Sequence, residues 1–265
     1  MEGDKLKNSA VLLFSKDPRR FFPNAFLKIG IFGKSDSDLL SQEVVEGNAF
    51  QLVDLTLDIL DKKFLKRMIS YEGITRIEKP EYPFEALREI LLNAIAHRNY
   101  MGAPIQLSIY DDKLMIWNEG NLPDDLPLED LKKKHASRPK NPLIADIFFK
   151  AGFIESWGRG IIKVLEECKK NGLPEPEISL NSGGISVTLF KNTLNDKNIK
   201  SLNLNERQIK AIKYLNEHNK ITNGDYQKLN SCSRATANRD LSDLLKKNII
   251  VSSEHKGVGS FYSLK

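Results

Sequence analysis

The feature that most constrains the fold of this chain is a polar stretch rich in Asn and Lys, KNTLNDKNIKSLNLN (191–205). Its apolar content is too low for packing into a core, which is typical of a linker. The stretch therefore predicts separately folded parts. In chain order, these are an N-terminal α/β segment that extends the next domain (1–79), an α/β domain (80–191), the linker (192–204) and a small domain (205–265).

The basic excess of the chain lies in its last part. The sequence has 40 Lys and Arg against 35 Asp and Glu, a net charge of +5. Residues 201–265 contain 11 of the basic and 6 of the acidic side chains, whereas residues 1–200 contain 29 of each. A positive charge confined to one part is expected where that part binds a polyanion such as DNA.

Composition and cysteine use indicate a cytoplasmic protein. No apolar run reaches the roughly 18–20 residues that a membrane helix needs, and the N-terminus lacks the pattern of a secretory signal. Cys168 and Cys232 have no metal-binding spacing and indicate reduced thiols. We therefore expect no membrane partner.

Apolar periodicity in residues 1–191 predicts alternating strands and helices. The predicted elements are strands at 10–14 and 25–32, a long helix from about Asn48 to Ile69, a buried helix at 84–97, a hairpin at 105–118, helices at 142–153 and 160–172, and two strands within 177–190. This order predicts an α+β fold, in which a mixed sheet packs under a helical layer as an α/β sandwich.

The C-terminal part has the order of a winged helix-turn-helix domain. The predicted elements are helices at 205–219, 223–230 and 234–248, the last two capped by Thr222 and Ser233, and strands at 249–254 and 260–265.

On the third of these helices, Ala237, Leu241, Leu244 and Leu245 form an apolar stripe. When the stripe packs inward, the candidate DNA-binding residues of this helix face outward: Arg234, Ala235, Thr236, Asn238 and Arg239. A further candidate, Lys256, lies at the tip of the wing formed by the two strands. We expect them to bind double-stranded DNA. The alternative is a three-helix interaction module whose charges are merely solvated. The run 233–241 resembles the start of the recognition helix in winged-helix regulators of bacteria.

A second candidate site lies on the predicted helix at 84–97. Glu89, Asn93 and His97 recur at i, i+4 and i+8 and share one face of an otherwise apolar helix. A buried carboxylate and carboxamide are costly unless they bind something. The alternative is a set of satisfied polar groups or an exposed stripe, and we interpret His97 as a helix-end histidine.

Two loops add to this site. Residues 118–123 follow a strand, and WGRGI (157–161) opens a helix, where backbone N–H groups can hold phosphate. No G-x-x-x-x-G-K-[ST] sequence is present, which excludes a P-loop ATPase.

Three runs, ALREILLNAIAHRNY (86–100), SRPKNPLIADIF (137–148) and WGRGI, resemble the ATP-binding fold shared by DNA gyrase, MutL, heat-shock chaperones and histidine kinases, called GHKL. The resemblance covers about residues 83–190 and is to the branch of RecG-like C-terminal domains and transcriptional regulators. Residues 8–25 resemble the segment that follows an upstream DNA-binding domain in that family. The resemblance implies a GHKL-like α/β sandwich that binds ATP with Mg²⁺.

The resemblance also implies roles for single residues. Glu89 would be the general base that orients the attacking water, and Asn93 the metal ligand, holding the Mg²⁺ that bridges the phosphates. The other implied nucleotide-binding residues are Asn118 at the adenine, Gly120 beneath the base, Gly158, Arg159 and Gly160 at the phosphates, and Thr188 in support of the adenine site.

One departure from that family lowers the activity that we expect. The usual Asp-x-Gly-x-Gly loop is Asn118-Glu119-Gly120-Asn121-Leu122 here, so a charge-assisted acceptor is lost. We therefore expect weak ATP hydrolysis, under a lid at about 124–157 whose basic residues could pair with phosphate: Lys132, Lys133, Lys134, Arg138 and Lys140.

Three functions remain open at this point. The first is an ATP-responsive, DNA-binding transcriptional regulator. The second is an ATPase acting in DNA processing or defence, tethered by its winged helix. The third is a DNA-binding protein whose middle domain is a degenerate scaffold that binds no nucleotide. A homodimer is left open in each case.

Overall fold

The structure is a computed structural model of the chain, and it describes residues 5–72, 74–155, 157–191, 204–218, 220–247, 249–253 and 260–264. The chain divides into two compact units, Met1–Asn192 and Thr193–Lys265. Within the described ranges, no helix has the length and apolar character of a membrane span.

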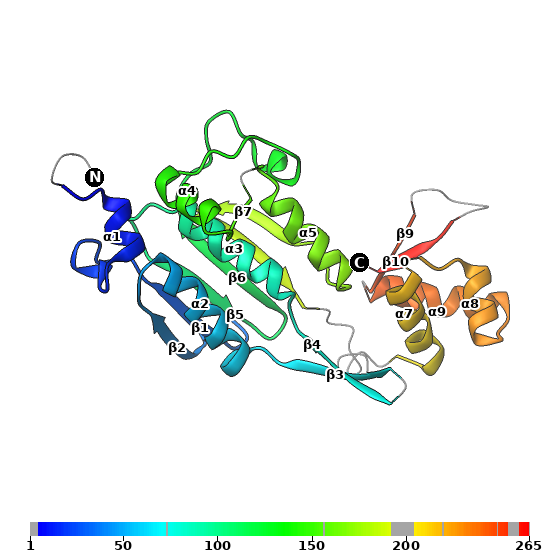
Figure 1. Cartoon of the computed structure of the whole chain (residues 1–265). Helices are drawn as coiled ribbons and strands as arrows, with labels where there is room; N and C mark the ends of the chain where they lie inside the picture. The colour runs from blue at the N-terminus through cyan, green and yellow to red at the C-terminus, as the bar shows by residue number, and fades with distance from the viewer. Residues whose placement is uncertain are drawn as a thin grey trace. The chain divides into compact units, whose positions relative to one another are not determined.

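The N-terminal unit is built on a six-stranded mixed sheet (Figure 1). Its strands, in sheet order, are β2 (Leu39–Val45), β1 (Leu27–Phe32), β5 (Ile105–Ile109), β6 (Lys113–Glu119), β8 (Gly184–Phe190) and β7 (Glu177–Asn181). β1 and β5 are parallel, and the other neighbours are antiparallel. A separate hairpin pairs β3 (Arg67–Glu72) with β4 (Thr75–Pro80).

Helices cover one face of this sheet (Figure 1). The helices of the unit are α1 (Asn8–Phe14), α2 (Ala49–Ile59), α3 (Phe84–His97), α4 (Pro142–Lys150) and α5 (Gly160–Lys170). Along β1, Leu27 and Ile29 are fully buried beneath them, whereas Lys28 is exposed. This mixed α+β architecture was predicted, and it is consistent with a GHKL-like α/β sandwich.

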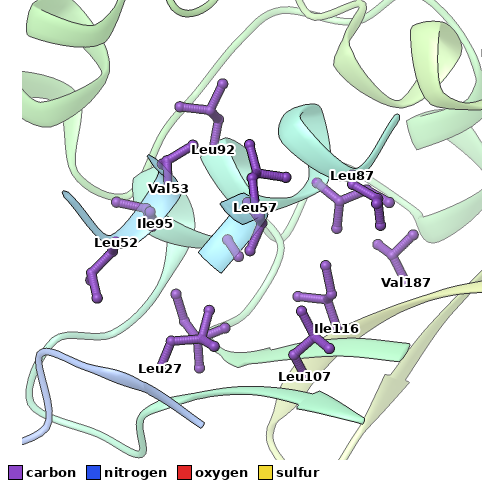
Figure 2. Close-up of a cluster of buried hydrophobic side chains, with 14 of the residues drawn as sticks. Leu27, Leu52, Val53, Leu57, Leu87, Leu92, Ile95, Leu107, Ile116 and Val187 are labelled. Carbon is purple, nitrogen blue, oxygen red and sulfur yellow. The ribbon is translucent and has the colours of Figure 1, made fainter. Parts of the chain in front are cut away.

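The core lies between the helices and the sheet, and α3 is its centre. Nine of the fourteen residues of α3 are buried. Figure 2 shows side chains from α2, α3 and four strands in one cluster, among them Leu52, Leu57, Leu87, Ile95, Leu27, Leu107, Ile116 and Val187. Full burial of each such side chain stabilises the fold by about 1.5–3 kcal/mol. The helix that carries Glu89 and Asn93 is therefore firmly placed.

Two predictions for the N-terminal segment were wrong. Residues 10–14 form part of helix α1, in which the neighbouring residues Leu12 and Leu13 are both buried and Phe14 is exposed. The prediction failed because a short apolar run does not distinguish a helix from a strand. The helix predicted from Asn48 to Ile69 ends early, in a π turn at 60–64, and Ile69 belongs to β3. Strand β2 was not predicted at all. The predicted helix at 84–97 and hairpin at 105–118 are confirmed.

In its described residues, the C-terminal unit contains three helices and a short antiparallel ribbon. They are α7 (Glu206–His218), α8 (Asn223–Asn230), α9 (Arg234–Lys246), β9 (Ile250–Ser252) and β10 (Tyr262–Leu264). Both predicted N-caps are confirmed: Thr222 Oγ1 accepts from Asp225 N (3.1 Å), and Ser233 Oγ accepts from Thr236 N (3.2 Å). The stripe on α9 packs inward as predicted, with Leu241 and Leu244 fully buried.

A buried carboxylate joins these three helices. Asp240 of α9 is 4% exposed and accepts hydrogen bonds from Arg207 Nε (2.8 Å), Tyr226 Oη (3.1 Å) and Asn205 Nδ2 (3.2 Å). Burial alone would raise the pKa of Asp240, but these donors hold it below its usual value. Asp240 therefore stabilises the unit as an anion.

Candidate functional site

Glu89 and Asn93 lie one turn apart on α3, and their side chains are joined. Asn93 Nδ2 donates to Glu89 Oε1 at 3.2 Å, and Glu89 is only 8% exposed. Burial raises the pKa of Glu89, which the charge of Lys163 and the hydrogen bond from Asn93 offset only in part. A buried acid with a raised pKa and a single hydrogen-bond donor among the described residues is typical of a functional site.

Two glycines allow the chain to approach this pair closely. A Cβ on Gly160, the first residue of α5, would overlap Glu89 Oε1 and lie 2.9 Å from Asn93 Nδ2. Gly158 has φ +63, and a Cβ there would overlap the carbonyl oxygen of His135. Residues without a side chain are therefore required where the 158–160 turn meets α3 and the segment around His135.

These residues open onto a cavity of about 350 Å³. Its floor is formed by the strands, through Ile116 and Asn118 of β6, Ile178 of β7, and Ile185 and Val187 of β8. Its other end holds Glu89, Asn93 and the N-terminus of α5, whose N-cap Arg159 makes no side-chain capping bond. The cavity is thus apolar at the sheet and polar at the helices, and its volume suits a small-molecule ligand.

The predicted lid segment lines the cavity in part. Residues 135–140 border it, and they include Arg138 and Lys140. Arg138 also donates to both oxygens of Asp125 at 2.8 Å. The neighbouring bases point to partners outside the cavity, since Lys132 pairs with Glu175 and Lys133 with Asp130. Of the five basic residues in the predicted lid, two, Arg138 and Lys140, are therefore among the described residues that line the cavity.

The structure brings six of the predicted nucleotide-binding residues together around the cavity: Glu89, Asn93, Asn118, Gly158, Arg159 and Gly160. Two others are not among its described lining. Gly120 (φ +153) instead packs against the end of α3, where a Cβ would lie 3.0 Å from the carbonyl oxygen of His97. Thr188 alternates with the floor residue Val187 along β8, so its side chain lies on the opposite face of the sheet.

Three residues line the cavity that were not predicted as part of the site. His97 lines the cavity rather than only ending its helix, and burial followed by the charge of His135 lowers its pKa. The i, i+4, i+8 spacing had already placed His97 on this face. His135 and Ser137 also line the cavity, but they lie in an irregular segment where no periodicity could reveal them.

The predicted DNA-binding residues lie on one end of α9. Arg234, Ala235, Asn238 and Arg239 are exposed, and Thr236 is half-buried. Asn238 Oδ1 accepts from Asn223 Nδ2 of α8 at 2.7 Å, which ties the two helices together. The remaining predicted residue, Lys256, lies outside the described residues.

No group of three or more His, Cys, Asp or Glu in the described part of the chain could hold a metal ion.

Comparison with known proteins agrees with this fold. Residues 102–189 match a family model described as "Putative ATP-dependent DNA helicase recG C-terminal", an ATPase-type domain. The match includes Asn118 and the 158–160 turn, whereas α3 precedes it. No curated protein sequence matches the chain.

One solved structure is similar over nearly the whole chain. The DIP2311 protein from Corynebacterium diphtheriae aligns with a TM-score of 0.61 and 19% sequence identity, over 98% of this chain and 54% of that one. At this identity the likeness concerns the fold alone. The present chain spans about half the length of that protein.

Proposed function

We propose that this protein is a nucleotide-responsive, DNA-binding regulator, which binds ATP with Mg²⁺ in the cavity of its N-terminal unit and duplex DNA on α9 of its C-terminal unit. One observation carries the proposal. The hydrogen-bonded pair of Glu89 and Asn93 faces Gly160 at the uncapped start of α5, and all three line one cavity with an apolar floor.

The two ends of the cavity fit the two ends of a nucleotide. A purine ring suits the aliphatic floor of the strands, where it would be shielded from water. The phosphates suit the opposite end, because the first N–H groups of α5 are available there and the helix dipole favours anions. Arg138 and Lys140 line the same cavity and add positive charge.

A magnesium ion fits Asn93 only together with phosphate. Mg²⁺ prefers oxygen ligands and usually takes one or two from the protein, the others being phosphate oxygens and water. Asn93 can supply its carboxamide oxygen because its amide nitrogen is the group that bonds Glu89. Bound with ATP, the ion would neutralise phosphate charge.

The proposed DNA surface is the N-terminal end of α9. The three helices and the ribbon are similar in order to a winged helix, in which this end enters the major groove. Its exposed side chains are small or basic, and the excess of positive charge lies in residues 201–265. Arg239 is the side chain best suited to a base edge or a phosphate.

Hydrolysis is a second candidate activity, favoured by the placement of Glu89. A buried carboxylate with a raised pKa is suited to act as a general base, which contributes about 10²–10⁴-fold in rate. We expect slow turnover, because an amide replaces a carboxylate at Asn118. An ATPase acting in DNA processing would require fast turnover instead.

Calorimetric titration with ATP and Mg²⁺ tests the nucleotide site. Gly160→Ala should weaken binding at least about tenfold, because the new methyl group would overlap Glu89 and leave polar groups unpaired. Gly224→Ala is the matched control, since its Cβ would lie 3.6 Å from Thr222 Oγ1, an ordinary contact. Asn93→Ala should remove the dependence on Mg²⁺. No binding by wild type at millimolar ATP would favour the scaffold function.

Binding to duplex DNA at increasing salt tests the second half of the proposal. Arg239→Ala should weaken binding by about 1–3 kcal/mol if it reads a base edge. Lys246→Ala, at the far end of α9, is the control and should change affinity much less. Affinity that is insensitive to salt and to both substitutions would contradict DNA binding.

Phosphate release by wild type and Glu89→Gln distinguishes a regulator from an ATPase. We expect turnover far below the typical enzymatic rate of about 10 per second, and a further loss in the variant. Fast wild-type turnover that depends on Glu89 would replace the regulator with the DNA-processing ATPase.

A further inference from the structure

The strand floor of the cavity presents only one polar side chain among the described residues. Four of its five floor residues are Ile or Val, and the fifth is Asn118. The backbone groups of β6 and β8 are engaged on both sides in the sheet, since β6 pairs with β5 and β8, and β8 pairs with β6 and β7. A flat ring placed on this floor therefore meets one carboxamide and otherwise aliphatic surface.

The carboxamide of Asn118 is buried but hardly used by the protein. Asn118 is 7% exposed, and its Nδ2 reaches the carbonyl oxygen of Glu119 at 3.5 Å, the outer limit of a hydrogen bond. In the described part of the chain, its Oδ1 accepts no hydrogen bond. Asn118 lines the cavity with this loosely held amide, so it is suited to a ligand that offers both a donor and an acceptor.

A carboxamide differs from a carboxylate in what it can pair with. It presents one acceptor and one donor group, whereas a carboxylate presents acceptors only. The edge of adenine has an amino donor at position 6 beside the ring acceptor N1. A 6-oxopurine has the reverse order, an acceptor at position 6 beside an N1–H donor.

The amide of Asn118 can pair with either order. Turning it by half a rotation exchanges its oxygen and nitrogen, and the long contact with Glu119 is too weak to hold one orientation. Each base then makes the same number of hydrogen bonds to the same side chain.

We propose that Asn118 reads the base through this exchangeable pair, so that the cavity takes 6-aminopurine and 6-oxopurine nucleotides with similar affinity. The inference rests on the proposed nucleotide site and adds its substrate class. The regulator would then respond to the total purine triphosphate present rather than to ATP alone.

Titration of the full chain with the Mg²⁺ complexes of ATP and inosine 5′-triphosphate tests this inference. Inosine triphosphate lacks the 2-amino group of guanine, so the two ligands differ only at the position 6 and N1 edge. We expect Kd values that differ by less than about tenfold, because the hydrogen bonds are equal in number. A preference for ATP above about 100-fold would overturn the inference and leave the nucleotide site in place.

Asn118→Leu shows whether the same side chain reads both bases. The variant should weaken both nucleotides by about tenfold or more, since each loses a buried pair of hydrogen bonds. Gln106→Leu is the control, because Gln106 is an exposed carboxamide on β5 that is not among the described lining residues of the cavity, and it should change neither Kd. If the variant weakens the binding of only one of the two nucleotides, or of neither, the inference is overturned.

Inorganic tripolyphosphate separates this inference from the proposed function. If tripolyphosphate binds as tightly as ATP, the base is not read and the inference fails, while the phosphate end of the site stands. If wild type binds no triphosphate at all, the proposed nucleotide site fails, and the inference fails with it. Fluorescence of Trp117 checks that the variants are folded.

Discussion

The two units of this protein each bury a carboxylate on a helix, and the surroundings shift the pKa of the two carboxylates in opposite directions. Glu89 of α3 has a single hydrogen-bond donor among the described residues, Asn93, and burial raises its pKa. Asp240 of α9 has donors from Arg207, Tyr226 and Asn205, and its pKa is lowered. Both residues are buried, at 8% and 4% exposed, and burial acts to raise both pKa values, but at Asp240 the three donors and the charge of Arg207 together outweigh it.

The difference separates an acid that stabilises its unit from one that we propose to be functional. Asp240 lies where α7, α8 and α9 meet, so α7 with its preceding residue and α8 supply donors that compensate the charge. Glu89 faces a cavity, so one side of it has no protein donor in the described structure. A buried acid that the fold leaves undercompensated costs stability, and such a cost is typical of a site that serves binding or chemistry.

The largest expected effect is that of Asp240→Ala. The substitution leaves the buried hydroxyl of Tyr226 without its acceptor, which costs about 1–3 kcal/mol. Urea unfolding followed by circular dichroism should show an early loss of helix. Both tryptophans, Trp117 and Trp157, lie in the N-terminal unit, so the fluorescence transition should not move. Glu206→Ala, at an exposed position of α7, is the control. A decrease of less than about 1 kcal/mol in the free energy of unfolding would contradict the structural role of Asp240.

Glu89→Gln should have a smaller effect of the opposite sign. The variant removes an undercompensated buried charge and keeps the shape of the side chain. We expect the melting temperature of the N-terminal unit to rise by about 2–4 °C at neutral pH, the shift that about 1 kcal/mol produces in a unit of this size. Glu85→Gln, one turn away and half exposed, is the control. A destabilised Glu89→Gln would mean that Glu89 is structural.

The pH dependence of stability should differ in sign at the two carboxylates. The lowered pKa of Asp240 means that its contribution is complete above the ordinary Asp value of 3.8 and is lost as pH falls through the lower folded value. The raised pKa of Glu89 means that stability is lost as pH rises from the ordinary value of 4.5 through the folded value.

Thermal melts of wild type and of the Asp240→Asn and Glu89→Gln variants between pH 3 and pH 7 measure these slopes. Each substitution should remove its own contribution. If both removed slopes have the same sign, the contrast between the two sites is wrong.

The smallest expected effect is that of Lys163→Met. Lys163 Nζ lies 3.6 Å from Glu85 Oε2, and its positive charge lowers the pKa of Glu89. Its removal should therefore raise the pKa of Glu89 further. Carbon-13 NMR of labelled Glu side chains measures the titration directly. Lys169→Met, in the last turn of α5, is the control. An unchanged titration of Glu89 would show that burial alone sets its pKa.

Local patterns predicted much of the fold and fewer of its long-range contacts. Helix α3 was placed to the residue, because its apolar positions recur at helical spacing between Pro83 and His97. The β5–β6 hairpin followed from alternation around Asp111 and Asp112. The run at 10–14 was assigned to a strand although it is helical, because five apolar residues carry no period that separates the two.

The sequence by itself determined which residues share a helix face, which ones cap a helix, and where the positive charge lies. These properties depend on neighbours within a few positions. Glu89 and Asn93, one turn apart, are of this kind. So are the capping residues Thr222 and Ser233.

Tertiary structure alone decided which distant residues meet. It brought Gly160 against Glu89 and Asn93, set Asn118 in an aliphatic floor, and turned Thr188 to the other face of its sheet. It also surrounded Asp240 with donors from two other helices. Such meetings depend on how helices pack and how strands are paired, and a one-residue change of register would reverse them. No local pattern carries that information.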